Sequence, residues 1–299
     1  MISVRHEVFI EVAQQKSFSK ASQSLYISQP AVSRHIKALE AEYGIQLFER
    51  KGVHVELTAA GRLLHSRLAD VKRIQEETAF ELSSMKDVMQ AKGILKLGGS
   101  TTVALYILPR VLSVFNQVYP QINISLLNRN TEIVVDALLN EEINLGITEG
   151  RTKLSNIQYQ PFVSDRVVAV CSRKSPFARK KNYAVQDITG MPVALRERGS
   201  GTLAALRHGL EKNGIRISDL NVKVRLGGTE ALKNFLVESE SVGFLPQKSV
   251  MRELEQGDLA ELSFEGLHIQ RNFYFIQRKG ENSELNNIFI KLAKQTYNL

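Results

Sequence analysis

The sequence predicts two globular regions joined by a long helix: a small helical domain with a β-hairpin, followed by a larger α/β domain. Three observations predict this organisation. Residues 1–58 show short helical patterns separated by tight turns. Residues 59–90 contain no proline, and no glycine after Gly61, as expected of one continuous helix. From Ile94 onward, strand-like apolar runs alternate with helical patterns, which is typical of parallel βαβ units.

The composition is that of an ordinary globular protein. A chain of 299 residues is long enough for two domains of about 150 residues each, and its 43% hydrophobic and 23% charged residues are close to globular averages. No apolar run reaches the roughly 20 residues of a membrane span. Charges interrupt the apolar stretch near the N-terminus, which argues against a signal peptide. We therefore expect a cytoplasmic protein.

Cysteine and histidine usage argues against disulfides and metal sites. The single cysteine, Cys171, excludes an intramolecular disulfide and a zinc site built from cysteines. Because it lies in the strand-like run VVAVCS, we predict a buried apolar thiol; a redox sensor is the alternative, although the chain holds no second cysteine to resolve it. The histidine spacing matches no recognised metal motif, so we predict no metal site.

The net charge favours an anionic partner but does not locate its site. The formal charge is +8, and nucleic acid is one candidate partner of such a protein. Residues 1–90 carry 12 Lys+Arg and 11 Asp+Glu, a net charge of +1, and the remaining residues carry +7. The site must therefore be sought in specific residues.

The segment 17–40 carries the pattern of two short helices joined by a tight turn. The first helix is predicted over residues 19–25, with Ser17 or Ser19 as its N-cap. Residues 26–27 form the turn. The second helix follows directly, and the arrangement is a helix-turn-helix.

The second helix has one buried face and one polar, basic face. Ser28 is a suitable N-cap, and Pro30 lies in the first turn, where its missing N–H costs no hydrogen bond. Apolar residues recur with helical spacing and form the buried stripe: Val32, Ile36 and Leu39. The opposite face presents Pro30, Ser33, Arg34 and Lys37.

That polar face has the chemistry to read a DNA duplex. Arg34 can donate two hydrogen bonds to guanine, Gln29 can pair with adenine, and the Pro30 ring can pack on a thymine methyl. Ser33 can contact a base or a phosphate, whereas we expect Lys37 to contact phosphate. Taken alone, the same face could equally be a solvated helix surface.

A hairpin is predicted directly after the helix-turn-helix. Leu47 and Phe48 are expected to anchor it in the core, and residues 50–54 form a turn between two short strands. A hairpin in this place is a wing, whose Arg50 and Lys51 would reach the DNA backbone or minor groove. Thr58 then caps the long helix.

The run SFSKASQSLYISQPAVSRHIKALEAEYGIQLFERKGVHVELTAAG closely resembles the N-terminal domain of LysR-type transcriptional regulators. The likeness extends over the whole chain, because family members have the same order of parts. It implies that Gln29, Pro30, Ser33 and Arg34 contact the major groove. His35 departs from the pattern, and we expect it to pack rather than to contact a base. The candidate DNA-binding set is Ser28, Gln29, Pro30, Ser33, Arg34, Lys37, Arg50 and Lys51.

The long helix carries a heptad pattern. Steps of four and three residues give Leu64, Leu68, Val71, Gln75, Thr78, Leu82, Met85 and Met89, of which six are apolar. This spacing predicts a coiled-coil seam between two copies of the chain, with dimerisation residues Leu64, Leu68, Val71, Leu82, Met85 and Met89. The alternative is a helix that packs on its own domain. The family resemblance implies a linker helix that pairs two DNA-binding domains, a near-palindromic operator and a tetramer of two dimers.

Short hydroxyl side chains follow four strands of the predicted α/β domain. In parallel sheets, ligands gather beyond the carboxyl ends of strands and at helix N-termini. The predicted effector-binding residues are Ser100, Thr101, Thr102, Thr148, Glu149, Gly199, Ser200, Gly201, Thr202 and Thr229. They fit a cleft for a small anion such as a carboxylate, a phosphate or a sulfur oxyanion. Each hydroxyl could instead simply cap its helix, and Glu149 would repel an anion unless it pairs with a cation.

The resemblance also implies the architecture of the α/β domain. It consists of two subdomains like those of periplasmic binding proteins: 93–161 with 268–299, and 162–267. The runs LPRVLSVFNQVYPQINI and RERGSGT look most like the branch that contains regulators of carbon-fixation and sulfite-reduction genes. That branch would suit a phosphorylated metabolite or a small sulfur species as effector.

The predicted function is that of a ligand-responsive regulator that binds double-stranded DNA. The resemblance implies RNA polymerase as a further partner at promoters. A stand-alone small-molecule binding protein is the alternative, but it leaves residues 1–58 without a purpose. The sequence contains no catalytic triad with local support, no metal spacing and no dinucleotide fingerprint, so we predict neither an enzyme nor a cofactor.

Overall fold

The computed structural model describes residues 2–51, 54–85, 87–150, 154–180 and 182–299. The chain divides into two compact units, residues 1–86 and residues 87–299. In the part of the chain that the structure describes, no helix is both long and apolar enough to cross a membrane.

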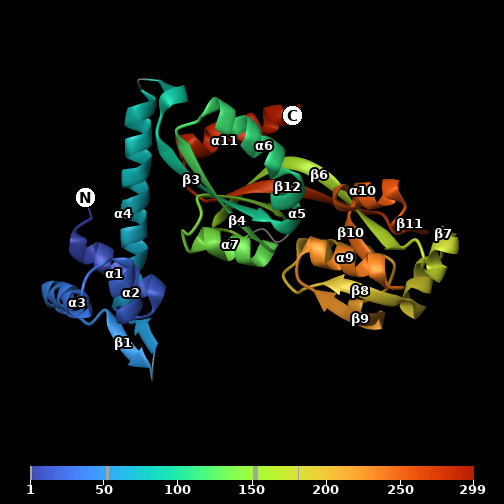
Figure 1. The fold of residues 1–299 in the computed structure, drawn as a ribbon, viewed down its shortest axis with the longest axis horizontal. Coiled ribbons are helices and arrows are strands. Elements are labelled where there is room, and N and C mark those ends of the chain that lie inside the picture. The colour runs from blue at the N-terminus through green and yellow to red at the C-terminus, as the bar shows by residue number, and fades with distance from the viewer. Residues whose placement is uncertain (1, 52–53, 86, 151–153, 181) are drawn as a thin grey trace. The chain divides into compact units, whose positions relative to one another are not determined.

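The N-terminal unit is a winged helix-turn-helix domain followed by one long helix (Figure 1). Its elements are α1 (Val4–Gln15), α2 (Phe18–Ser24), α3 (Gln29–Tyr43), β1 (Phe48–Lys51), β2 (His54–Leu57) and α4 (Ala59–Ser84). The predicted caps form: the backbone N–H groups of Lys20, Ala31 and Gly61 donate to the hydroxyls of Ser17, Ser28 and Thr58. The core contains Val8, Phe9, Val12, Ala21, Val32, Ile36, Leu39, Leu47 and Leu68.

Helix α4 is shorter than the helix predicted over residues 59–90. It ends at Ser84, with Met85 as its C-cap. The backbone is extended at Asp87, whose side chain accepts a hydrogen bond from the Met89 N–H and starts a separate 3-10 turn, η1 (Val88–Gln90). Met89 therefore does not continue a seam on α4, contrary to the prediction.

The first two residues of the predicted seam pack wholly or partly inside their own domain. Leu68 belongs to the core of the helix-turn-helix domain, and Leu64 packs against that core. Leu68 is therefore buried in its own domain rather than facing a second copy, contrary to the prediction, and Leu64 is partly buried there. Val71, Leu82 and Met85 remain exposed, Leu82 at 60% and Met85 at 80%.

The second unit is an α/β domain built on one mixed sheet of ten strands. Its main path runs β4-β3-β5-β12-β6-β10-β8-β9, and β11 pairs with β6 and β7. The strands are β3 (Gly93–Ser100), β4 (Ile122–Arg129), β5 (Leu145–Glu149), β6 (Ile157–Ser172), β7 (Asn182–Tyr183), β8 (Pro192–Arg196), β9 (Asn221–Leu226), β10 (Val242–Pro246), β11 (Leu259–Phe264) and β12 (Ile269–Arg278). The predicted parallel pairing holds for β3 with β4 and β5, and for β8 with β9 and β10.

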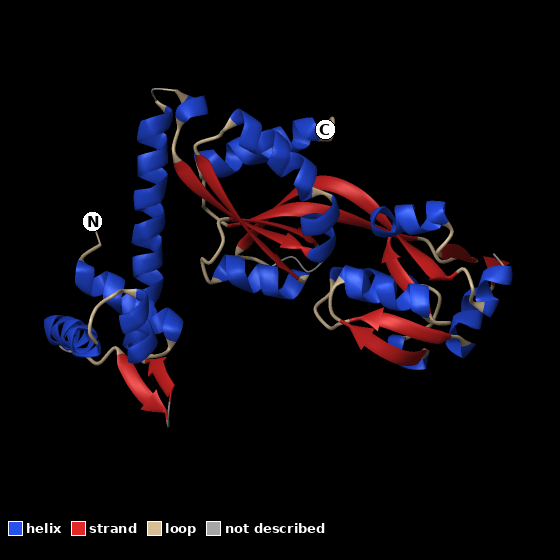
Figure 2. Ribbon diagram, in the orientation of Figure 1, coloured by secondary structure: helices blue, strands red, loops and turns tan. Residues whose placement is uncertain are grey.

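Helices cover both faces of this sheet. They are α5 (Thr101–Tyr106), α6 (Leu108–Val118), α7 (Thr131–Leu139), α8 (Gly201–Glu211), α9 (Thr229–Glu238), α10 (Gln247–Gln256) and α11 (Glu284–Thr296), with short turns η2 (Pro176–Arg179), η3 (Val185–Gly190) and η4 (Ile217–Asp219). Around β3–β5, α6 and α11 cover one face and α7 the other (Figure 2). The rings of Phe115 on α6 and Phe289 on α11 pack 5.2 Å apart.

The α/β domain has two lobes that share two long strands. We call β3–β5 with α5–α7 and α11 the first lobe, and β7–β11 with α8–α10 the second lobe. The N-terminal half of β6 pairs with β12, and its C-terminal half pairs with β10 and β11. The subdomain boundary predicted after residue 161 falls inside β6, and the one after residue 267 lies just before β12. Continuous strands, rather than loops alone, therefore join the lobes.

Cys171 lies in the core of the second lobe, where it is fully buried. Burial raises the pKa of its thiol above the ordinary value. This environment fits the predicted apolar thiol.

Candidate functional site

The second helix of the helix-turn-helix, α3, presents the predicted DNA-reading side chains to solvent. Gln29, Pro30, Arg34 and Lys37 are exposed, and Ser33 is half-buried. The Gln29 amide donates to the Ser33 hydroxyl at 3.2 Å, so these two side chains hold each other in place. The exposed row is a surface that a DNA groove could accept.

The other predicted DNA contacts contribute less information. The Ser28 hydroxyl accepts from the Ala31 N–H at 3.3 Å, so its first role is the cap of α3. His35 is half-buried, as expected of a packing residue. Arg50 and Lys51 belong to β1, opposite Val55 and His54 of β2. The side chains of Arg50 and Lys51 lie outside the described part of the structure.

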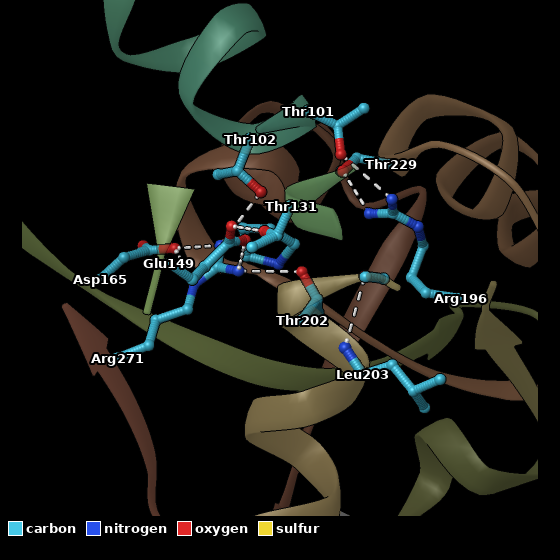
Figure 3. A network of polar contacts seen from close by, with 12 residues as sticks. Thr101, Thr102, Thr131, Glu149, Asp165, Arg196, Thr202, Leu203, Thr229 and Arg271 are labelled. Carbon is cyan, nitrogen blue, oxygen red and sulfur yellow. Dashed lines mark hydrogen bonds and ion pairs between the residues drawn. The ribbon is translucent and has the colours of Figure 1, made fainter. Parts of the chain in front are cut away.

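In the α/β domain, predicted strand-end residues from both lobes converge on an arginine of β12 (Figure 3). Arg271 is buried, with only 4% of its side chain exposed. Its guanidinium contacts the Glu149 carboxylate at 2.6 Å and the Asp165 carboxylate at 2.8 Å. It also donates to the hydroxyls of Thr202 at 2.9 Å and Thr102 at 3.1 Å. Arg271 is thus the cation that Glu149 required.

A second buried arginine, Arg196 at the end of β8, binds two further threonines. It donates to the hydroxyl of Thr229 at 2.8 Å and to that of Thr101, in the first lobe, at 3.0 Å. Its two remaining bonds go to Glu197, at 2.8 and 2.9 Å. Arg196 therefore ties the second lobe to the N-terminus of α5 in the first (Figure 3).

The surroundings of Glu149 favour its charged form although it is buried. Burial alone would raise the pKa of its carboxyl, but the Arg271 guanidinium and the hydrogen bond from the Thr131 hydroxyl, 2.7 Å long, hold that pKa below the ordinary value. The Ser100 hydroxyl also lowers the pKa of Glu149. That hydroxyl is itself buried, and among the described residues it makes no hydrogen bond of ordinary length and angle.

Two glycines allow the lobes to approach at this point. Gly199 has a φ of +82°, which favours glycine, and its carbonyl accepts from the Glu132 N–H of α7 at 3.4 Å. At Gly201, the first residue of α8, an added Cβ would lie 2.4 Å from the carboxyl carbon of Glu149. The Glu149 carboxylate therefore lies directly against the N-terminus of α8.

Two predicted residues take other places. Ser200 caps α8 by accepting from the Leu203 N–H at 3.4 Å. Thr148 is buried on β5. Among the described residues, neither Ser200 nor Thr148 forms a hydrogen bond with Arg196 or Arg271.

Sequence reasoning missed both arginines, as well as Asp165 and Thr131. A signal for Arg271 does exist in the strand pattern, because the buried side of β12 alternates as Ile269, Arg271, Phe273 and Phe275. A lone arginine on a buried strand face must have partners. No residue spacing, however, indicates that those partners are Glu149 and Asp165.

Family comparison agrees with this geometry in both units. Residues 5–62 match the family described as bacterial regulatory helix-turn-helix protein, lysR family. Residues 89–298 match the LysR substrate binding domain. The chain belongs to the LysR family. It is a transcriptional regulator with a helix-turn-helix DNA-binding domain and an effector-binding domain, and not an enzyme.

Individual relatives of this LysR-type regulator cover nearly its whole length. It is 28% identical over 292 residues to the HTH-type transcriptional regulator CysL of Bacillus subtilis (strain 168), covering 97% of this chain and 96% of CysL. It is 29% identical over 274 residues to a probable RuBisCO transcriptional regulator of Thalassiosira pseudonana, covering 90% of this chain and 89% of the relative. The second relative confirms the predicted likeness to regulators of carbon-fixation genes.

A solved relative of the effector-binding domain carries a ligand. The CcmR regulatory domain of Synechocystis PCC6803, in complex with 2-PG, is 28% identical and superposes with a TM-score of 0.63. The match covers 70% of this chain and 99% of the CcmR domain.

Within the described residues, no group of three or more His, Cys, Asp or Glu side chains could hold a metal ion.

Proposed function

We propose that this LysR-type regulator binds a near-palindromic operator as a homo-oligomer, and that a small anion bound between the lobes of its effector-binding domain changes that binding. RNA polymerase is its expected protein partner at the promoter. The observation that carries the effector half is the convergence of two buried arginines and the hydroxyls of four threonines where strands of both lobes end.

The DNA half of the proposal rests on the exposed face of α3. Arg34 offers the forked donor pair that matches guanine, and Lys37, one helical turn further on, offers a point charge for phosphate. Two copies joined through the exposed apolar residues of α4 would present two such helices. Two half-sites related by the dimer axis give a near-palindromic operator.

The choice of an anion rests on the chemistry of the site. Guanidinium groups, threonine hydroxyls and helix N-termini all favour negative charge. The N-terminus of α8 meets a carboxylate already, that of Glu149. The complex of the CcmR domain with 2-PG makes 2-PG the first compound to test.

The test measures DNA affinity as a function of anion at constant ionic strength. The protein is first used to capture fragments of genomic DNA. These fragments are then titrated with the protein in the presence of 2-PG, phosphate or sulfate, with uncharged glycerol as the control. We expect at least one anion to change the affinity about fivefold or more, within the usual range of allosteric coupling. If no anion changes either the DNA affinity or the melting temperature of the protein, the proposal of an anionic effector is wrong.

A further inference from the structure

Among the described residues, five charged groups at the effector site pair with one another. Arg271 pairs with Glu149 and Asp165, and Arg196 pairs with Glu197. Three carboxylates thus face two guanidinium groups. An anion that pairs with either of these guanidinium groups must therefore take a place that a protein carboxylate occupies.

Two of the three carboxylates are poorly placed to leave. Glu197 neighbours Arg196 in the chain, binds it through both carboxylate oxygens and also accepts from the Gly228 N–H at 3.3 Å. Asp165 accepts from both Nε and Nη2 of Arg271 and is 2% exposed. Both are fixed locally to the arginine that they neutralise.

Glu149 differs from these two because its carboxylate contacts groups of both lobes. It contacts Nη1 of Arg271, accepts from the Thr131 hydroxyl of α7, and lies against the N-terminus of α8 in the other lobe. The buried Ser100 hydroxyl beside it has no hydrogen bond of ordinary geometry with any residue that the structure describes. This set of contacts comes from both lobes, and each of them would suit a bound anion equally well.

We propose that Glu149 is an internal ligand of the effector site, whose carboxylate holds Arg271, Thr131 and the N-terminus of α8 until an anionic effector displaces it. This inference rests on the proposed function, since it assumes an anion at the same site. It adds a specificity rule. An effector must compete with a tethered carboxylate, so a dianion or an anion with several acceptor oxygens is preferred over a simple monocarboxylate.

The proposal predicts that a weaker interaction between residue 149 and Arg271 raises the affinity of the protein for the anion. In Glu149→Gln the side chain keeps its shape but loses the charge that competes for Arg271. In Glu149→Asp it keeps the charge but is one methylene too short to make the same contacts. The affinity for the anion is expected to rise from wild type to Glu149→Asp and further to Glu149→Gln. A merely structural role for Glu149 would instead lower the affinity in both variants.

Calorimetric titration of the full-length protein with 2-PG and with sulfate, at constant ionic strength, tests this order. We expect Glu149→Gln to bind about tenfold tighter than wild type or better, equivalent to about 1.4 kcal/mol. Glu197→Gln is the matched control, because it removes the same charge from the same cluster at a carboxylate that stays in place. It is expected to change affinity by no more than about twofold to threefold, as a general charge effect.

Each outcome decides the proposal. Equal tightening in Glu149→Gln and Glu197→Gln would mean that only total charge matters, and would overturn it. Unchanged or weaker binding in Glu149→Gln, with the wild type still binding, would overturn it while leaving the proposed function intact. No binding by the wild type or any variant would remove the anionic effector and this inference together. Should Glu149→Gln fail to fold, Glu149→Asp decides in the same way: tighter binding supports the internal ligand, and unchanged or weaker binding overturns it.

Discussion

The Nη1 atom of Arg271 lies 2.6 Å from Oε1 of Glu149, although the two residues are 122 positions apart in the chain. The pair joins β12, which the two lobes share, to the end of β5 in the first lobe. Asp165 of β6 completes the arrangement from the other side of the guanidinium. One buried arginine therefore pairs with two buried carboxylates at the point where the lobes meet.

Removal of Arg271 is expected to destabilise the effector-binding domain strongly. In Arg271→Met, Glu149 and Asp165 lose their cation while they stay buried, and breaking a buried pair in this way costs about 3–5 kcal/mol. Urea unfolding followed by circular dichroism measures the free energy of unfolding. The control is Arg216→Met, because Arg216 is exposed and pairs with Asp219 on the surface; its free energy of unfolding should change little. Similar losses in both variants would contradict the account.

The contribution of Glu149 to stability depends on pH in a defined direction. Its pKa in the folded protein lies below the ordinary value of 4.5. The charged form is therefore stabilised by folding, and this contribution is fully present above that ordinary value and is lost as the pH falls through the folded pKa. The difference in melting temperature between wild type and Glu149→Gln should stay level from about pH 7 to pH 5 and shrink below about pH 4.5. A difference that widens in acid would show that the direction of the shift is wrong.

Arg34 and Lys37 are expected to affect DNA binding in different ways. Arg34→Ala should lose about 1–3 kcal/mol of discrimination at one base pair of each half-site. Lys37→Ala should weaken binding to all sequences alike and reduce the slope of log affinity against log salt by about one. Competition binding with operator variants over a range of salt concentrations separates the two effects. Arg34 has no base-reading role if its alanine variant keeps full sequence preference.

The same substitution at two leucines of α4 should give opposite results. Leu68 lies in the core of its own domain, so Leu68→Ala should lower the free energy of unfolding of that domain by about 2–5 kcal/mol. Leu82 is exposed in the single chain, and we propose that it faces a second copy. Leu82→Ala should raise the dimer dissociation constant about tenfold or more, with little change in unfolding of the domain. Sedimentation equilibrium checks this, and an unchanged constant would remove Leu82 from the dimer interface.

Local signals in the sequence predicted most of the fold. Ser17, Ser28 and Thr58 cap their helices by accepting hydrogen bonds from residues only three positions away. The starts of these helices therefore depend on local sequence alone. The alternation of strands and helices likewise predicted an α/β domain with parallel strands, whereas its division into two lobes was implied by the family resemblance. The end of α4 was missed because the Asp87 side chain starts a separate turn, although residues 85–90 contain no glycine or proline.

The candidate site was only half predictable, for a different reason. Thr101, Thr102, Thr202 and Thr229 follow strands, and the carboxyl ends of strands share an edge, so their convergence follows from topology. The choice of Arg271 and Arg196 as their partners depends on pairings across 33 to 169 positions of sequence, which no local pattern encodes. Periodicity also failed at Leu68, because a heptad stripe looks the same whether it faces its own core or a second chain.

Sequencing of the genomic DNA that the purified protein captures tests the central claim most directly. Sheared DNA is bound to the full-length protein and, in parallel, to Ser33→Asp, which places a carboxylate on the proposed groove-contacting face of α3. The account predicts sharp peaks that share a near-palindromic motif and disappear with Ser33→Asp. Enrichment that is absent, or that is equal in both proteins with and without 2-PG, phosphate and sulfate, would contradict sequence-specific regulation through this helix.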